Sequence, residues 1–171
     1  MNPKLDPIFA RRSVRTFGNQ PVEDGQIRDL LEAAMAAPSA VAKDPWHFHV
    51  IREQTERERL ADALPSGQML RQAPVAIIVV GDLELAHDNL LSYMIQDCSA
   101  AIENLLLAAS ILGLGACWLG VHPREDRVAA LREQFDLPSS QIPVSAIALG
   151  WPEQQPAPRT RYQESRVHGI G

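Results

Sequence analysis

The predicted fold is built around one apolar stretch of nine residues, Ala73-Pro74-Val75-Ala76-Ile77-Ile78-Val79-Val80-Gly81. Residues 75–80 are all apolar and all but Ala76 are β-branched, a composition that favours extended backbone. Successive side chains of a strand point to opposite faces of its sheet, so an unbroken apolar run is typical of burial on both faces. We therefore predict a strand here that is buried on both faces.

Other stretches around this run predict further strands and several helices. The predicted strands cover residues 47–51, 116–121 and 144–150. The predicted helices start near Pro7 and cover residues 23–37, 53–64, 83–112 and 124–135, of which 53–64 is expected as a polar surface helix and 124–135 as a surface helix. The helix near Pro7 fades around Arg12 to Ser13, so the arginines there fall at a helix end or in the following loop. Strands and helices mix without strict alternation, which predicts the α+β class.

The helix predicted for residues 83–112 is apolar nearly all round from Met94 onward, which indicates a place in the core or at a subunit interface. The apolar tract from Leu105 to Val121 approaches the length of a short membrane span. It contains three glycines, however, so a helix that runs into a buried strand explains it better. We expect no membrane as partner.

Length and charge limit the possible functions. The 171 residues fit one domain, 1–171, with a core of its own. Sixteen Lys and Arg against 21 Asp and Glu give a net charge of −5, which argues against nucleic acid as partner. The stretch 153–171 has too little apolar content to form its own core, so it either stays free or wraps a partner.

The two cysteines and the N-terminus indicate the compartment. Cys98 and Cys117 lie in apolar surroundings without metal-binding spacing, so we expect buried free thiols. Residues 1–12, MNPKLDPIFARR, lack the basic and apolar regions of a signal peptide. Both observations favour a cytoplasmic protein.

A cluster of arginines near the N-terminus suggests an anion site. The segment 8–17, IFARRSVRTF, holds Arg11, Arg12 and Arg15 beside Ser13. Guanidinium forks, a hydroxyl and the free N–H groups of a helix end can together bind a phosphate. A solvated basic patch is the alternative, and these residues alone leave both interpretations open.

Other candidate sites have less support from their spacing. His47 and His49 share one face of a predicted strand, but no third ligand stands at metal-binding spacing, so we expect no metal. Ser39 lacks the flanking glycines of a nucleophile elbow, and no P-loop or dinucleotide fingerprint occurs in the sequence. Asp97, inside the apolar helix, is either a structural carboxylate bonded to backbone or an active-site group.

Several motifs carry a family resemblance. In chain order they are RRSVRTF at 11–17, Pro21-Val22, Ala37-Pro38-Ser39-Ala40, Pro45-Trp46-His47-Phe48, Ala73-Pro74, Asp97, GLGACWLG at 113–120, ALGWP at 148–152 and RTRY at 159–162. Together they cover nearly the whole chain, which resembles the FMN-dependent nitroreductase family. The resemblance implies a nitroreductase-like α/β/α sandwich of the α+β class, with a central mostly antiparallel sheet. It also implies a homodimer with two FMN molecules at the subunit interface.

By this resemblance the residues expected to bind FMN come from four segments. The phosphate and ribityl chain would be held, and the pyrimidine edge of the ring reached, by Arg11, Arg12, Ser13 and Arg15. The isoalloxazine would pack against Pro38, Ser39 and Ala40 of the second subunit, and the flavin would be flanked by Leu119 and Gly120. The site would close on the phosphate through Arg159 and Arg161. The tail 153–171 would wrap the partner subunit.

The implied activity is an NAD(P)H-dependent FMN oxidoreductase that reduces nitroaromatics, quinones or similar small acceptors. Hydride from NADH or NADPH would reach flavin N5 and leave negative charge near N1, where a fixed guanidinium such as Arg15 would stabilise the reduced anion. Electrons would then pass to a second substrate, which predicts ping-pong kinetics. Beyond this proposed role of Arg15, no catalytic residue is assigned.

The chain departs from the family pattern in the loop after Ser39. Many members have Asn and Gln where this chain has Ala42 and Asp44, so a flavin hydrogen bond from residue 42 is lost. The loop PSAVAKDPW is closer to the iodotyrosine-deiodinase branch. Only 14 residues separate Asp82 from Asp97, however, which is too few for the substrate lid of that branch. The pattern is typical of a short member that lacks this lid.

Two alternative functions stay open on the sequence. In the first, a member of the same fold sequesters or consumes flavin, so that FMN is cargo or substrate. In the second, the arginines belong to a non-enzymatic module that binds some other phosphate ligand.

Overall fold

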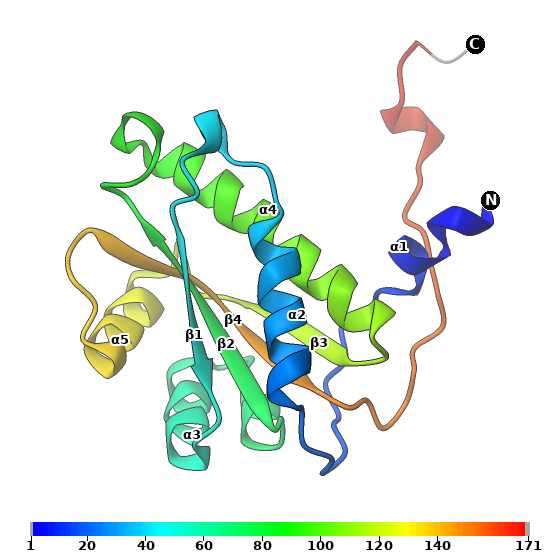
Figure 1. The fold of residues 1–171 in the computed structure, drawn as a ribbon, viewed down its shortest axis with the longest axis horizontal. Coiled ribbons are helices and arrows are strands. Elements are labelled where there is room, and N and C mark those ends of the chain that lie inside the picture. The colour runs from blue at the N-terminus through cyan, green and yellow to red at the C-terminus, as the bar shows by residue number, and fades with distance from the viewer. Residues whose placement is uncertain (1, 170–171) are drawn as a thin grey trace.

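A four-stranded sheet forms the middle layer of this structure, a computed structural model that describes residues 2–169 (Figure 1). Its strands are β1 (Trp46–Ile51), β2 (Val75–Asp82), β3 (Gly115–Gly120) and β4 (Gln141–Gly150). Their spatial order is β1-β2-β4-β3, and each neighbouring pair is antiparallel. The central antiparallel sheet expected from the resemblance is therefore confirmed.

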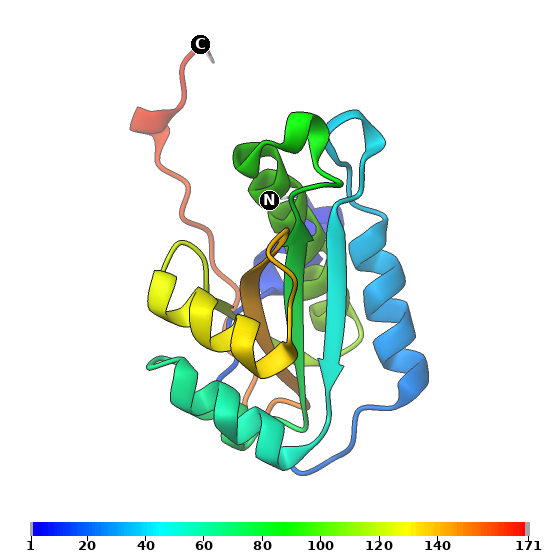
Figure 2. The ribbon, with the colours of Figure 1, turned by 90° about the vertical axis from the view of Figure 1, so that its left-hand side faces the viewer.

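The central strand β2 is buried on both faces, as its unbroken apolar run predicts. Residues 75, 77 and 79 pack into the core with α2 (Asp24–Met35) and α4 (Leu91–Ile111). Residues 76 and 78, together with residue 80, pack into the core with α3 (Gln54–Ala63) and α5 (Glu125–Phe135). Figure 2 shows α2 and α5 on opposite sides of the sheet, so the α/β/α sandwich is confirmed.

The helix predicted for residues 83–112 is wrong at its beginning, because α4 starts only at Leu91. Asp82 ends β2 and its Oδ1 accepts the N–H of Glu84 at 3.0 Å, which forms a turn in place of the first helical turn. Asn89 has a left-handed backbone with φ of 53°, which a continuous right-handed helix excludes. The chain therefore turns twice between β2 and α4.

The two cysteines are free and buried, as predicted, and they lie on opposite faces of the sheet. Cys98 belongs to the core with α2 and α4, and Cys117 to the core with α3 and α5. Burial, with Asp97 as a smaller cause, raises the pKa of Cys98 to about 12. Burial also raises the pKa of Cys117, so both thiols stay protonated near neutral pH.

The two ends of the described chain run side by side. Beyond β4 the tail from residue 153 to 169 is irregular except for one short 3-10 helix, Glu164–Arg166, and it passes α1 (Asp6–Ala10) (Figure 1). The N–H of Arg159 donates to the carbonyl of Phe9 at 3.2 Å, and the guanidinium of Arg12 donates to the carbonyl of Ala157. These bonds join the tail to α1 and to residues 11–15, the arginine segment.

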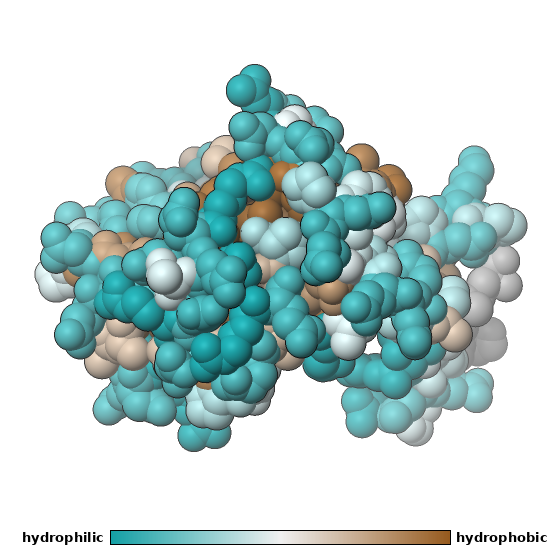
Figure 3. All heavy atoms as spheres, turned by 90° about the horizontal axis from the view of Figure 1, so that it is seen from below, coloured by the Kyte–Doolittle hydropathy of each residue, from teal (hydrophilic) through white to brown (hydrophobic). Residues whose placement is uncertain are grey.

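The surface at the α3 end of the molecule is largely hydrophilic (Figure 3). This agrees with the prediction of a polar surface helix at residues 53–64, since only three residues of α3 are buried. Within residues 2–169, no helix combines the length and the apolar character needed to cross a membrane.

The arginine segment is fixed to the edge strand β3. The N–H of Val14 donates to the carbonyl of Ala116 at 3.0 Å, and Ser13 forms an isolated parallel bridge with the same residue. The side chain of Val14 is buried over Gly115, where an added Cβ would lie 2.7 Å from Val14 Cγ1. Only glycine at position 115 lets the segment approach β3 this closely.

Replacement of Gly115 by alanine should therefore displace Val14 and destabilise the protein. We expect Gly115→Ala to lower the free energy of unfolding by about 1–3 kcal/mol, because a stiff β-branched side chain must move out of a packed position. Urea unfolding followed by circular dichroism measures this change.

Gly25→Ala is the matched control. A Cβ there meets no atom within 4 Å, and the site lies in α2, so we expect no loss of stability or a gain of about 0.5–1 kcal/mol. Equal stability of Gly115→Ala and the unchanged protein would show that the segment tolerates a wider separation from β3.

Candidate functional site

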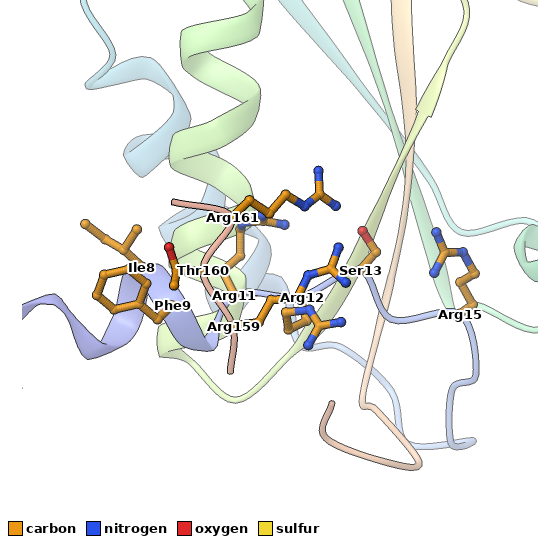
Figure 4. Close-up of a pocket in the computed structure, with 9 residues that line it drawn as sticks. All are labelled: Ile8, Phe9, Arg11, Arg12, Ser13, Arg15, Arg159, Thr160 and Arg161. Carbon is orange, nitrogen blue, oxygen red and sulfur yellow. The ribbon is translucent and has the colours of Figure 1, made fainter. Parts of the chain in front are cut away.

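A cavity of about 380 Å³ opens between α1, the arginine segment and the tail. Its lining consists of Ile8, Phe9, Arg11, Arg12, Ser13, Arg15, Arg159, Thr160 and Arg161 (Figure 4). Among the residues that the structure describes, no carboxylate contributes to this lining. The cavity is thus surrounded by guanidinium groups and two hydroxyls, which are donors for an anion.

Local structure explains how the arginines reach the cavity. α1 ends at Ala10, and the next residue already has an extended backbone, with its N–H bonded to the carbonyl of Pro7 at 3.2 Å. The chain then runs along β3, and the tail returns beside it through the bond from Arg159 to Phe9. Residues from both ends of the sequence therefore line one cavity.

The charges of this cluster are only partly compensated. Arg11 Nε lies 3.1 Å from Glu103 Oε1 on α4, and this pair is half-exposed. Within the described part of the chain, neither Arg12 nor Arg15 forms an ion pair, and the same holds for the tail arginines. An excess of positive charge is left for a bound anion.

Figure 4 shows that Arg15 lies apart from the other four arginines, on the far side of Ser13. It also lines a second cavity of about 160 Å³. The lining of this second cavity is Arg15, Leu64, Ser66, Cys117, Trp118, Leu119, Gly120 and Arg127. The two cavities thus share Arg15, and we treat them together as the candidate site.

The predicted residues Leu119 and Gly120 line this second cavity together with Arg15, although they do not line the first. A Cβ on Gly120 would meet nothing within 4 Å, so the backbone at the end of β3 faces open space. A flat ring could approach the chain closely at this point.

Arg127 was missed by the sequence reasoning, which treated residues 124–135 as a surface helix. It lies in the first turn of α5, and its Nη1 donates to the carbonyl of Gly120 at 2.8 Å. The available signal was a cation at the N-terminal end of a helix, where the helix dipole disfavours positive charge.

The predicted residues Pro38, Ser39 and Ala40 line neither cavity of this chain. They begin a loop in which Val41, Ala42 and Asp44 have left-handed backbones, with φ of 55°, 52° and 49°. Such a conformation is strained for a β-branched residue like Val41.

Two carboxylates hold this strained loop. Asp44 Oδ1 accepts the hydroxyl of Ser39 at 2.5 Å, and Asp97 Oδ1 accepts the N–H of Ala40 at 2.9 Å. Asp97 is 5% exposed, and its Oδ2 is buried without a hydrogen-bond partner among the described residues. Of the two interpretations of Asp97, the structure supports the carboxylate bonded to backbone.

The donor set of the two cavities fits FMN. Guanidinium forks and the Ser13 hydroxyl match the oxygens of a phosphate, and the open backbone at Gly120 leaves room for a flat ring. Arg15 stands between these two parts. The site could therefore bind a ligand with an anion at one end and an aromatic ring at the other.

Comparison with known proteins agrees with this architecture. The model of the nitroreductase family matches residues 8–68 and 63–151 of this chain. A protein of Methanothermobacter thermautotrophicus, provisionally named NADH dehydrogenase/NAD(P)H nitroreductase, is 44% identical over 164 residues, which are 96% of this chain and 85% of the relative.

Two crystal structures extend the comparison. A protein of Bacteroides thetaiotaomicron with the same provisional name has a TM-score of 0.92 and 41% identity, over 99% of this chain and 98% of that one. A provisionally assigned nitroreductase of Desulfovibrio desulfuricans, solved in complex with FMN, has a TM-score of 0.86 and 31% identity, over 100% of this chain and 98% of the other.

Asp97 should be essential for the order of the loop from 39 to 44. Asp97→Ala leaves the N–H of Ala40 without its acceptor, so we expect the free energy of unfolding to fall by about 1–3 kcal/mol. Trypsin should also cleave faster after Lys43, which is exposed in this loop.

Asp97→Asn is the matched variant, because it keeps an acceptor oxygen at the same place. Its stability should stay within about 1 kcal/mol of the unchanged protein, with cleavage at Lys43 as slow as before. Equal cleavage rates in all three proteins would show that Asp97 does not order the loop.

Proposed function

The chain belongs to the nitroreductase family, and from this premise we propose that it is an FMN-dependent NAD(P)H oxidoreductase that reduces nitroaromatics, quinones or similar small acceptors. NAD(P)H-dependent flavin chemistry is supported by the family and by the names of the relatives. The class of acceptor is our extension from the resemblance of the motifs.

The observation that carries the proposal is the row of guanidinium groups that runs from the tail to Arg15, which lines both cavities. In the proposed complex, Arg11, Arg12, Arg159 and Arg161 neutralise the phosphate of FMN and Ser13 donates its hydroxyl to it. When bound, FMN supplies two-electron transfer from NAD(P)H to the acceptor.

Arg15 has a separate role in this proposal. It lies apart from the phosphate group of arginines and lines the cavity beside Gly120, where the ring would lie. A fixed cation there stabilises the negative charge that reduction leaves on the ring. Because the electrons move through the cofactor, the proposal requires no protein nucleophile.

We further propose that two chains form a homodimer and complete each other's site. Pro38, Ser39 and Ala40 would reach the ring bound by the partner, and residues 153–171 would wrap the partner. Two features support this arrangement: the strained loop presents Val41 with 70% of its surface exposed, and Tyr162 of the tail is 66% exposed. Part of the tail, residues 170 and 171, lies outside the described residues.

Removal of two arginines should remove the cofactor. In the variant Arg11→Ala/Arg15→Ala we expect FMN to bind at least 100-fold more weakly, since one charge-assisted contact is lost at each end and each contributes about 1.5–3 kcal/mol. The measurement is flavin absorbance of the purified protein, followed by titration with FMN.

Arg28→Ala/Arg124→Ala is the control, because it removes two exposed arginines that line neither cavity. Its FMN content should not change. Full flavin occupancy in Arg11→Ala/Arg15→Ala would contradict the assignment of the site.

The proposed reaction should show two half-reactions with a common binding face. We expect NAD(P)H oxidation to depend on added menadione or nitrofurazone and to give parallel lines in double-reciprocal plots at several acceptor concentrations. A protein that binds FMN stoichiometrically but oxidises no NAD(P)H with either acceptor would instead fit a flavin-sequestering function.

A further inference from the structure

Arg127 is held at the candidate site by a bond to the main chain of β3. Its Nη1 donates to the carbonyl of Gly120 at 2.8 Å, so the guanidinium is fixed beside the strand end that the proposed function assigns to the ring. Its Nε is buried and, among residues 2–169, has no hydrogen-bond partner. A buried donor without a partner is costly, so helix packing alone gives no reason to keep an arginine here.

The electrostatics of α5 also disfavour a cation at this position. Arg127 lies in the first turn of an 11-residue helix, next to Glu125 and Asp126, which are favourable at that end. Neither of these carboxylates pairs with it, and in the described part of the chain no other carboxylate lies within 4.0 Å of its nitrogens. Its positive charge is therefore uncompensated.

A second uncompensated cation faces the same cavity. Arg15 and Arg127 both line the cavity of about 160 Å³, and no Asp or Glu of the described chain belongs to that lining. The other ionisable group there is the Cys117 thiol, whose pKa is raised by burial, so it adds no negative charge near neutral pH. Two like charges beside one small cavity repel, and an anion between them would relieve this repulsion.

We propose that Arg127 is a second cation for the ring end of FMN, which together with Arg15 favours the reduced cofactor over the oxidised one. The inference rests on the proposed function, because it needs FMN in this site. NAD(P)H is oxidised to NAD(P)⁺ as it transfers a hydride, two electrons with one proton, and the ring is left with one negative charge. Arg127 stabilises that charge while its bond to Gly120 holds the strand end in place.

The test compares the affinities of oxidised and reduced FMN in Arg127→Gln. Both dissociation constants are measured anaerobically, with dithionite as reductant, and the midpoint potential of the bound flavin is measured against a reference dye. We expect the preference for reduced FMN to fall about tenfold, which equals a midpoint potential about 30 mV lower for a two-electron couple.

Two variants serve as controls. Arg124→Gln removes an exposed charge three residues away, at the N-cap of α5, and should change the preference by less than about twofold. Arg127→Lys keeps the charge and should also stay within about twofold. If Arg127→Gln fails to fold, Arg127→Lys tests the proposal instead. A tenfold loss of the preference for reduced FMN in Arg127→Lys would show that the positive charge of residue 127 does not set this preference.

Other results overturn the inference in recognisable ways. If oxidised and reduced FMN both bind more weakly by the same factor in Arg127→Gln, Arg127 only holds Gly120 in position. In Arg127→Gln, the preference for reduced over oxidised FMN could stay unchanged while the KM rises for NADPH but not for NADH. That result would show that Arg127 binds the additional phosphate of NADPH and not the flavin ring. Absence of FMN binding by the unchanged protein would contradict the proposed function itself, which none of these variant results would do.

Discussion

The attachment of the arginine segment to β3 is the contact on which the candidate site depends. One backbone hydrogen bond, from Val14 to Ala116, and the close packing of Val14 on Gly115 fix the direction of five residues that carry three arginines. Because β3 is one of the two edge strands, its outer side is free to receive this segment. The edge is covered, and the covering chain is the one that carries the guanidinium groups.

The sheet supports this edge from within. β2 and β4 lie in the middle, and each contributes side chains to the cores on both faces, so two helical layers are held by the same strands. The cavities lie at the periphery of this rigid centre, where loops and helix ends supply polar groups. Stability and ligand binding are thus assigned to different parts of the chain.

Much of the fold could be predicted from the sequence because its strands are unbroken apolar runs, of which residues 75–80 are the clearest. The start of α4 was missed because the turn depends on one carboxylate, Asp82, bonding to a nearby N–H, and hydrophobic periodicity does not record that competition. The arginines of the first motif were found by composition and by family resemblance. Arg127 was not, because its importance comes from a contact with Gly120 that only the folded chain creates.

The bond between Arg12 and Ala157 joins residues 145 positions apart, whereas the sheet and both cores are complete without residues 153–169. The first cavity also needs Arg159 and Arg161, so it exists only while the tail lies against α1 and the arginine segment. Local release of the tail would therefore open this cavity while both cores stay folded.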